Sequence, residues 1–223
     1  MLQSNTLRFL KSLARNNNKP WMDANRAAYE TARADFAVFV QQLIDAFGKK
    51  EPAIANLLAK DCMFRINRDI RFAKDKAPYK KNFAASINKG GKKGISSAGY
   101  YFHVQPGETF IGGGIWMPEP ADLKKIRQEI DYNYGDLKKL VSSKDFKKVY
   151  GDLDDSPEYK LTRLPKGYEP GNPAEEYIKL KSFIGSRSLT DEQLTDKSLL
   201  KTTVGAFEAL KPLVDFLNQA MEG

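Results

Sequence analysis

The sequence has 223 residues, of which 41% are hydrophobic and 29% are charged, and its formal net charge is +8. This composition is typical of a globular chain and excludes a collagen-like or wholly disordered protein. A single cysteine and a single histidine exclude an internal disulfide, a cysteine-based zinc site and a multi-histidine metal cluster, so we expect no metal. The longest apolar run, residues 36–40, is far below the roughly 20 residues that cross a bilayer. We therefore predict one cytoplasmic domain covering residues 1–223, with no membrane partner.

The N-terminal third has the spacing of amphipathic helices. Leu7, Leu10 and Ala14 fall on one face, which favours a first helix over an organelle-targeting presequence. From Trp21 onward, apolar residues recur every three or four positions until Gly48, where we expect a long core-facing helix to end. A shorter helix is expected at residues 53–59.

The middle of the chain changes to a two-residue period, which is typical of half-buried strands. Alternation predicts a strand over residues 64–72, and further strands are expected at residues 82–87, 99–105 and 109–116. The last two are joined by Pro106-Gly107, which predicts a hairpin.

Helical patterns return in the last third. A helix is expected at residues 119–132, and a capping box at Thr190 to Gln193 opens the terminal helical region, where Pro212 either kinks one helix or starts another. Helices, then strands linked by hairpin connections, then helices again indicate an α+β fold with a central antiparallel sheet and helical N- and C-terminal regions.

The excess positive charge lies in one segment. Residues 65–94 contain 10 basic and 2 acidic residues, a net charge of 10 − 2 = +8, and the remainder is neutral with 26 of each sign. Such a segment attracts anions, although a solvated basic loop has the same composition.

Alternation within the strand predicted at residues 64–72 places Arg65, Asp69 and Arg71 on one face. Asp69 then lies between two arginines. Either the three residues form a structural ion-pair row, or Asp69 orients the arginines for bidentate contact with a phosphate or carboxylate. Arg68 falls on the apolar face, where a guanidinium needs a carboxylate or several carbonyl partners.

A turn with exposed cations follows that strand. It carries Lys76 and Lys80 around Pro78-Tyr79, and a tyrosine among lysines can stack on a base or pack against the sheet edge. The loop at residues 89–94 is basic and glycine-rich, but it lacks the spacing of a phosphate-binding Walker motif.

An even-length hairpin loop pairs His103 with Phe110 and Tyr101 with Gly112, and places Tyr101, His103 and Trp116 on one face. The glycines of that face leave room for a ligand, or they mark a close approach of a ring or backbone. His103 is the one side chain whose unperturbed pKa lies near neutrality, so it is the candidate for acid/base catalysis, although a lone histidine on a strand is more often structural.

The residues from Phe64 to Lys80 resemble the signature F-R-I-x-R-D-x-R-F-x-x-D-K-x-P-Y-K of a bacterial and fungal family of domains of unknown function. Stretches at residues 16–29, 99–118 and 180–183 resemble other motifs of that family. The resemblance implies a shared fold and no particular activity. The positions that it marks are Arg65, Arg68, Asp69, Arg71, Asp75, Lys76, Pro78, Tyr79, Lys80, Tyr101, His103, Gly114 and Trp116.

These observations favour a pocket for a small anionic, phosphorylated ligand, with the cofactor and the question of catalysis left open. In this hypothesis Arg65, Arg71, Lys76 and Lys80 bind the anion, Asp69 orients the arginines, and Tyr101 and Trp116 form an apolar wall. Two alternatives stay open: sequence-tolerant nucleic-acid binding through the same basic segment, and a non-catalytic interaction or scaffold protein in which the charged motif is an internal ion-pair network.

Overall fold

A computed structural model describes residues 1–94 and 96–222, and the chain divides into two compact units. Each unit is assembled from segments that are distant in the sequence. The first unit contains Met1–Lys93, Tyr101–Ile111 and Ser188–Gly205, and the second contains Gly94–Tyr100, Gly112–Arg187 and Ala206–Gly223.

Within the described residues, the strands form a four-stranded antiparallel sheet in the order β1-β2-β3-β4. The strands are β1 (Phe83–Ile87), β2 (Gly99–Val104), β3 (Thr109–Ile115) and β4 (Phe183–Leu189). The predicted α+β class, with an antiparallel sheet and helical terminal regions, is confirmed. β4 was not predicted from the sequence. Residues 180–183, which end at its first residue, were identified only as a stretch that resembles a family motif.

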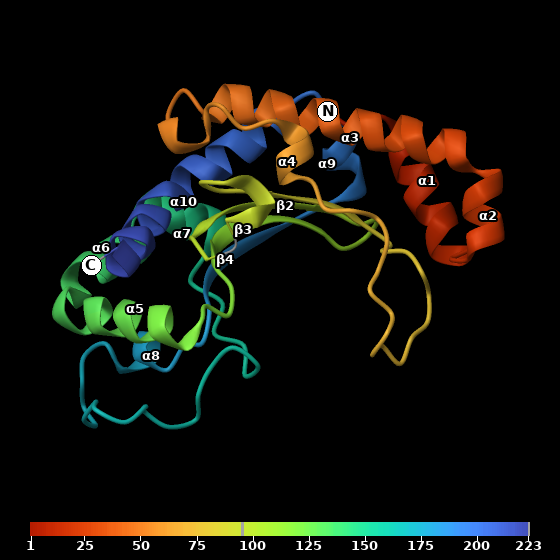
Figure 1. Cartoon of the computed structure of the whole chain (residues 1–223). Coiled ribbons are helices and arrows are strands. Elements are labelled where there is room, and N and C mark those ends of the chain that lie inside the picture. Colours follow the sequence, from red (N-terminus) through yellow and green to blue (C-terminus); the bar gives the residue numbers. More distant parts are fainter. Residues whose placement is uncertain (95, 223) are drawn as a thin grey trace. The chain divides into compact units, whose positions relative to one another are not determined.

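Helices and short 3-10 turns build most of the first unit. Figure 1 shows α1 and α2 lying beside α3, with α4 above the sheet. Their bounds are α1 (Ser4–Arg15), α2 (Lys19–Ala24), α3 (Arg26–Phe47), η1 (Pro52–Ile54), α4 (Ala59–Cys62), η2 (Gly91–Lys93) and α9 (Asp191–Thr195). The capping box predicted at Thr190 is present at the start of α9.

The core of the first unit lies between α3 and one face of the sheet. The ring of Phe36 lies 5.5 Å from that of Phe83 on β1 and 6.0 Å from that of Phe102 on β2. Phe39, one helical turn further along α3, contacts Phe102 at 5.2 Å. All four rings are buried. The three- and four-residue spacing on α3 therefore produces the stripe that covers β1 and β2.

The single helix predicted from Trp21 to Gly48 is instead two helices that meet at Asn25. Asn18 caps α2 by accepting a hydrogen bond from the Trp21 N–H at 2.9 Å. The Asn25 side-chain amide donates to the Trp21 carbonyl at 2.9 Å, and the Asn25 backbone leaves helical geometry at φ −111°. An asparagine that bonds the preceding turn in this way competes with helix continuation.

The strand predicted over residues 64–72 is wrong. The segment makes only isolated bridges, Met63 to Ala85 and Asn67 to Tyr79, and then leaves the sheet as a loop, drawn in gold in Figure 1. The alternation reflects which side chains face solvent, but the backbone hydrogen bonds that define a strand are absent beyond Arg68. The hairpin is as predicted: the Glu108 N–H donates to the Gln105 carbonyl at 2.9 Å across Pro106-Gly107.

The second unit is largely helical. Its helices are α5 (Pro120–Tyr132), α6 (Tyr134–Val141), α7 (Lys144–Tyr150) and α8 (Glu175–Ile178), with the C-terminal part of α10 (Leu199–Glu222). Pro212 lies inside α10, which continues through it as one helix. No helix among the described residues has the length and apolarity to cross a membrane.

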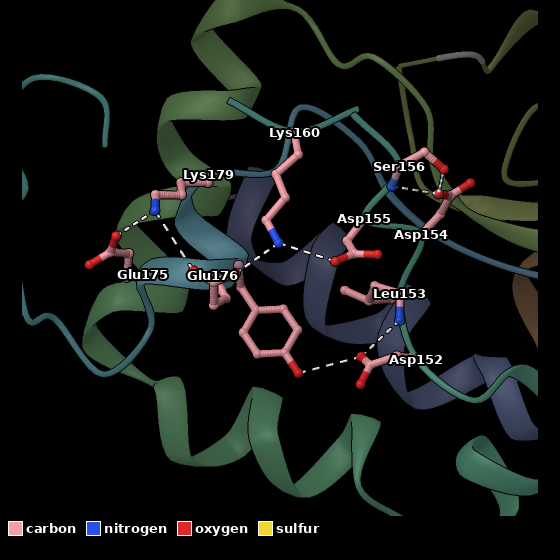
Figure 2. A network of polar contacts seen from close by, with 10 residues as sticks. Asp152, Leu153, Asp154, Asp155, Ser156, Lys160, Glu175, Glu176 and Lys179 are labelled. Atoms are coloured by element: carbon pink, nitrogen blue, oxygen red, sulfur yellow. Dashed lines mark hydrogen bonds and ion pairs between the residues drawn. The ribbon is translucent and has the colours of Figure 1, made fainter. Parts of the chain in front are cut away.

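Lysines and acidic side chains tie the α8 segment of the second unit to the chain that precedes it (Figure 2). Lys160 pairs with Asp155 at 3.1 Å and with Glu176 at 2.8 Å. Lys179 pairs with Glu175 at 2.5 Å along the same helix. These cations are neutralised locally.

Candidate functional site

The segment from Met63 to Arg68 runs along the outer side of β1 and returns through residues 78–80. The Lys80 N–H donates to the Ile66 carbonyl at 2.8 Å, and the Arg68 N–H donates to the Pro78 carbonyl at 2.9 Å. These bonds form an irregular ribbon, and the loop of residues 69–77 extends from its end (Figure 1).

Arg68 fastens the base of this loop. Its guanidinium donates to the Asp75 carboxylate at 2.8 Å and to the Ala77 carbonyl at 3.0 Å, and its side chain is only 27% exposed. The Ala77 N–H, together with Arg68, lowers the pKa of Asp75 below its usual value. A guanidinium on the apolar face was expected to need a carboxylate or carbonyl partners, and Arg68 has one of each. Arg68 therefore stabilises the base of the loop.

The loop also pairs its own remaining charges. Arg71 forms a two-point contact with Asp69, Nε to Oδ1 at 3.0 Å and Nη2 to Oδ2 at 2.7 Å. The Arg71 side chain and N–H lower the pKa of Asp69, and the more distant charge of Arg65 lowers it further. Lys76 donates to the Ile70 carbonyl at 3.1 Å. Asp69 was predicted to lie in a row between two arginines, but it pairs with Arg71 alone. The neighbouring Phe72 is 94% exposed.

An open pocket of about 540 Å³ lies against the ribbon, and all of its lining residues belong to the first unit. Four cationic side chains converge on it: Arg33 from α3, Lys60 from α4, Arg65 from the ribbon and Lys92 from η2. The full set of lining residues is Tyr29, Glu30, Arg33, Lys60, Met63, Phe64, Arg65, Ile66, Asn67 and Lys92.

The four cations have no carboxylate partner in the part of the chain that the structure describes. Lys92 Nζ donates to the Lys60 carbonyl at 2.8 Å, which fixes η2 against α4 and brings the two amines to the same rim. Unneutralised cations around one concave surface create a positive potential, which is the electrostatic requirement for holding an anion. Of the residues predicted from the sequence to bind a ligand, Arg65 alone lines this pocket.

Tyr79 and Lys80 lie beside the ribbon in different surroundings. Asn17 holds the Tyr79 backbone through a bond from the Tyr79 N–H at 3.0 Å and a bond to its carbonyl at 2.9 Å, and the residue is only 7% exposed. The residue is therefore largely covered by the protein, which leaves little ring surface for the stacking role considered for it. Lys80 Nζ lies 5.2 Å from the centre of the Phe64 ring, and burial lowers the pKa of Lys80.

Tyr101 and His103 lie on the sheet face opposite α3, in a row of half-buried rings. His103 stacks on Phe110 at 4.8 Å, which agrees with the even hairpin register, and Tyr101 contacts Phe110 at 5.6 Å and Phe64 at 6.3 Å. Burial lowers the pKa of His103 below its ordinary value of 6.5. Asp69, which could have oriented the imidazole, is bonded to Arg71 instead. Catalysis by His103 stays a prediction.

The glycines of β3 lie in the second unit, together with Trp116. A Cβ built on Gly112 would lie 2.6 Å from the Gly185 carbonyl oxygen, and one on Gly114 would lie 2.0 Å from the Phe183 oxygen. A Cβ at either position would thus meet the backbone of β4, so the close approach of that strand explains these glycines. Trp116 is 63% exposed and does not belong to the unit that holds the cationic pocket.

Comparison with protein families gives a match over nearly the whole chain. The model of a conserved hypothetical protein family, DUF2461, covers residues 5–216. The chain belongs to the DUF2461 family. The resemblance to a domain-of-unknown-function family inferred from the sequence is thus confirmed, and the matched range includes every element of the pocket. No curated protein and no solved structure matches this DUF2461 chain.

Sequence reasoning missed most of the pocket. Arg33 and Lys60 are isolated cations on helix surfaces, and they lie 32 and 5 positions before Arg65 in the DUF2461 chain. Lys92 belongs to the basic loop that the sequence singled out, but nothing local assigns it to the same site as Arg65. One signal was present: Arg33 follows Tyr29 by four residues, so both lie on one face of α3.

Proposed function

We propose that the protein binds a small anionic, phosphorylated ligand in the pocket lined by Arg33, Lys60, Arg65 and Lys92. The observation that carries this proposal is the convergence of four cations, none paired with a carboxylate among the described residues, on one pocket of about 540 Å³. Pockets of roughly 300 to 1,000 Å³ accommodate small molecules. Arginine offers bidentate contacts to phosphate oxygens and lysine offers a mobile point charge.

The other charged residues of the motif have supporting roles in this proposal. Arg68 fastens the loop to the ribbon, and Asp69, Arg71 and Lys76 maintain the shape of the loop. Lys80 lies against the ring of Phe64 and adds to the positive potential. The anion is therefore assigned to cations that the fold leaves unneutralised, rather than to the whole basic segment.

The test is a thermal-shift panel of inorganic phosphate, pyrophosphate and sugar phosphates on the full chain. A ligand at 100 times its Kd adds about 2.7 kcal/mol, which raises the Tm of a chain of this length by roughly 5 to 11 °C. We expect Arg65→Ala to abolish the rise. Lys74→Ala is the matched control, because Lys74 is an exposed cation of the same segment outside the pocket lining. Equal loss in both variants, or no rise with any anion, refutes the proposal.

The concentration of net charge in residues 65–94 supports a second candidate, sequence-tolerant nucleic-acid binding. Binding of this kind is governed by the number of cations rather than by one pocket, and it weakens steeply with salt. Arg65→Ala and Lys74→Ala should then reduce oligonucleotide affinity equally. Absence of a gel shift at about 50 mM salt, where electrostatic binding is strong, eliminates this candidate.

A further inference from the structure

We infer that the ligand of the cationic pocket is a nucleoside diphosphate. This inference rests on the proposed function and adds the chemical class of the ligand. The first argument is charge: the lining carries four cations and Glu30, a formal charge of 4 − 1 = +3. A carboxylate ligand neutralises one of these charges and a phosphate monoester about two, whereas a diphosphate ester near pH 7 carries about three.

The second argument is size. The pocket volume of about 540 Å³ lies within the range of roughly 300 to 1,000 Å³ that is typical of sites for small organic molecules. Inorganic phosphate or pyrophosphate leaves much of this space to solvent. A ligand that fills the pocket therefore has an organic part attached to its phosphates.

The third argument is the chemistry of the wall that the organic part meets. Tyr29 lines the pocket, and its half-buried ring lies 5.9 Å from that of Phe9 and 6.4 Å from that of Phe83, with the Arg26 guanidinium 5.8 Å from its centre. Phe64 lines the pocket from the ribbon. Aromatic walls favour a flat ring, because every nucleobase offers a π-face for stacking.

The polar groups of the same wall suit a base and a ribose. The Asn67 side chain is exposed and makes no hydrogen bond in the described structure, so its two donors and one acceptor are available. An asparagine amide recognises a base edge through paired donor and acceptor contacts. Glu30 offers carboxylate oxygens that accept from ribose hydroxyls.

The experiment is isothermal titration of the full chain with pyrophosphate, glucose 1,6-bisphosphate, and the diphosphates ADP, GDP, CDP and UDP. We expect the best nucleoside diphosphate to bind roughly 5- to 150-fold more tightly than pyrophosphate, the affinity equivalent of one stacked base. Glucose 1,6-bisphosphate, which has a phosphorylated organic part without an aromatic ring, should bind no better than pyrophosphate.

Four variants test where the base and the phosphates bind. Tyr29→Leu and Asn67→Ala should weaken nucleoside diphosphate binding more than pyrophosphate binding, and so remove the preference for the nucleoside diphosphate. Tyr29→Phe retains the ring and should retain the preference, which separates stacking from loss of packing against Phe9. Arg65→Ala should weaken both ligands.

The outcomes separate the two hypotheses. If pyrophosphate binds through Arg65 and no nucleoside diphosphate binds more tightly, the nucleotide inference is overturned and anion binding stands. If a nucleoside diphosphate binds more tightly but Tyr29→Leu and Asn67→Ala leave its preference intact, the base lies elsewhere and the inference is again overturned. If neither ligand binds, the proposed function fails as well.

Discussion

Three arginines of one motif lie within seven residues and have different surroundings, so replacing each with alanine should give three different results. Arg65 is exposed and lines the cationic pocket. Arg68 is largely covered and bonded to Asp75 and to the Ala77 carbonyl. Arg71 is 77% exposed and paired with an exposed carboxylate. Composition alone assigns all three to one basic patch.

Arg68→Ala should destabilise the protein. The variant loses a hydrogen bond to the Ala77 carbonyl, which contributes about 1 kcal/mol, and the packing of an aliphatic stem that is mostly covered in the fold. The surface ion pair adds little. A loss of about 1 to 2 kcal/mol lowers the Tm of a chain of this length by roughly 2 to 8 °C.

Arg65→Ala should leave the Tm unchanged and abolish the stabilisation by inorganic phosphate or pyrophosphate. Arg71→Ala should change neither property, because the pair that it breaks is solvent-screened and lies outside the pocket lining.

The assay is differential scanning fluorimetry of the three variants with and without pyrophosphate, supported by urea denaturation. Early melting of Arg65→Ala would show that this residue is structural and would remove the main support for the pocket. Loss of pyrophosphate binding in Arg71→Ala with Arg65→Ala unaffected would move the anion site to the loop.

The remaining predictions concern two glycines, one in β3 and one in α10, and His103 on β2. Gly114→Ala should lower the free energy of unfolding by about 2 to 5 kcal/mol in urea denaturation, because Gly114 has φ +107° and its Cβ would meet the Phe183 carbonyl oxygen at 2.0 Å. Gly205→Ala in α10, where a Cβ meets nothing within 4 Å, should stabilise by about 0.5 to 1 kcal/mol, and a similar loss in both would refute the reasoning. Burial lowers the pKa of His103 in the folded protein, so the unfolded chain takes up a proton at a higher pH than the folded chain does. The free energy of unfolding should therefore fall as the pH drops below about 6.5, and it should level off at the pKa of His103 in the folded state. His103→Gln should reduce the dependence of the free energy of unfolding on pH in this range. An unchanged dependence would contradict the prediction.

Local patterns predicted most of the fold. The apolar stripe of α3, the capping box at Thr190 and the two-residue hairpin loop each depend on neighbours in the sequence, so spacing was sufficient to identify them. The helix break at Asn25 was missed because it depends on one side-chain amide that bonds the preceding turn. The strand predicted at residues 64–72 failed because alternation reports solvent exposure and not backbone pairing.

The candidate site was less accessible to sequence reasoning. Arg65 was predicted, whereas Arg33 and Lys60 come to it from α3 and α4 through the packing of those helices. A cation on an exposed helical face has the same local pattern whether or not a second element brings other cations close. Tertiary packing, rather than any motif, assembles the pocket.

Pairing, more than the count of charges, separates structural cations from candidate ligand-binding ones in this protein. Within residues 65–76, Arg68 and Arg71 each have a carboxylate partner, so their charges are already neutralised within the loop. Arg65 has no such partner in the described structure, although it belongs to the same motif. A phosphate that displaced Asp69 from Arg71 would have to replace two hydrogen bonds, whereas at Arg65 it would replace only water. The anion should therefore bind where the fold leaves cations unneutralised.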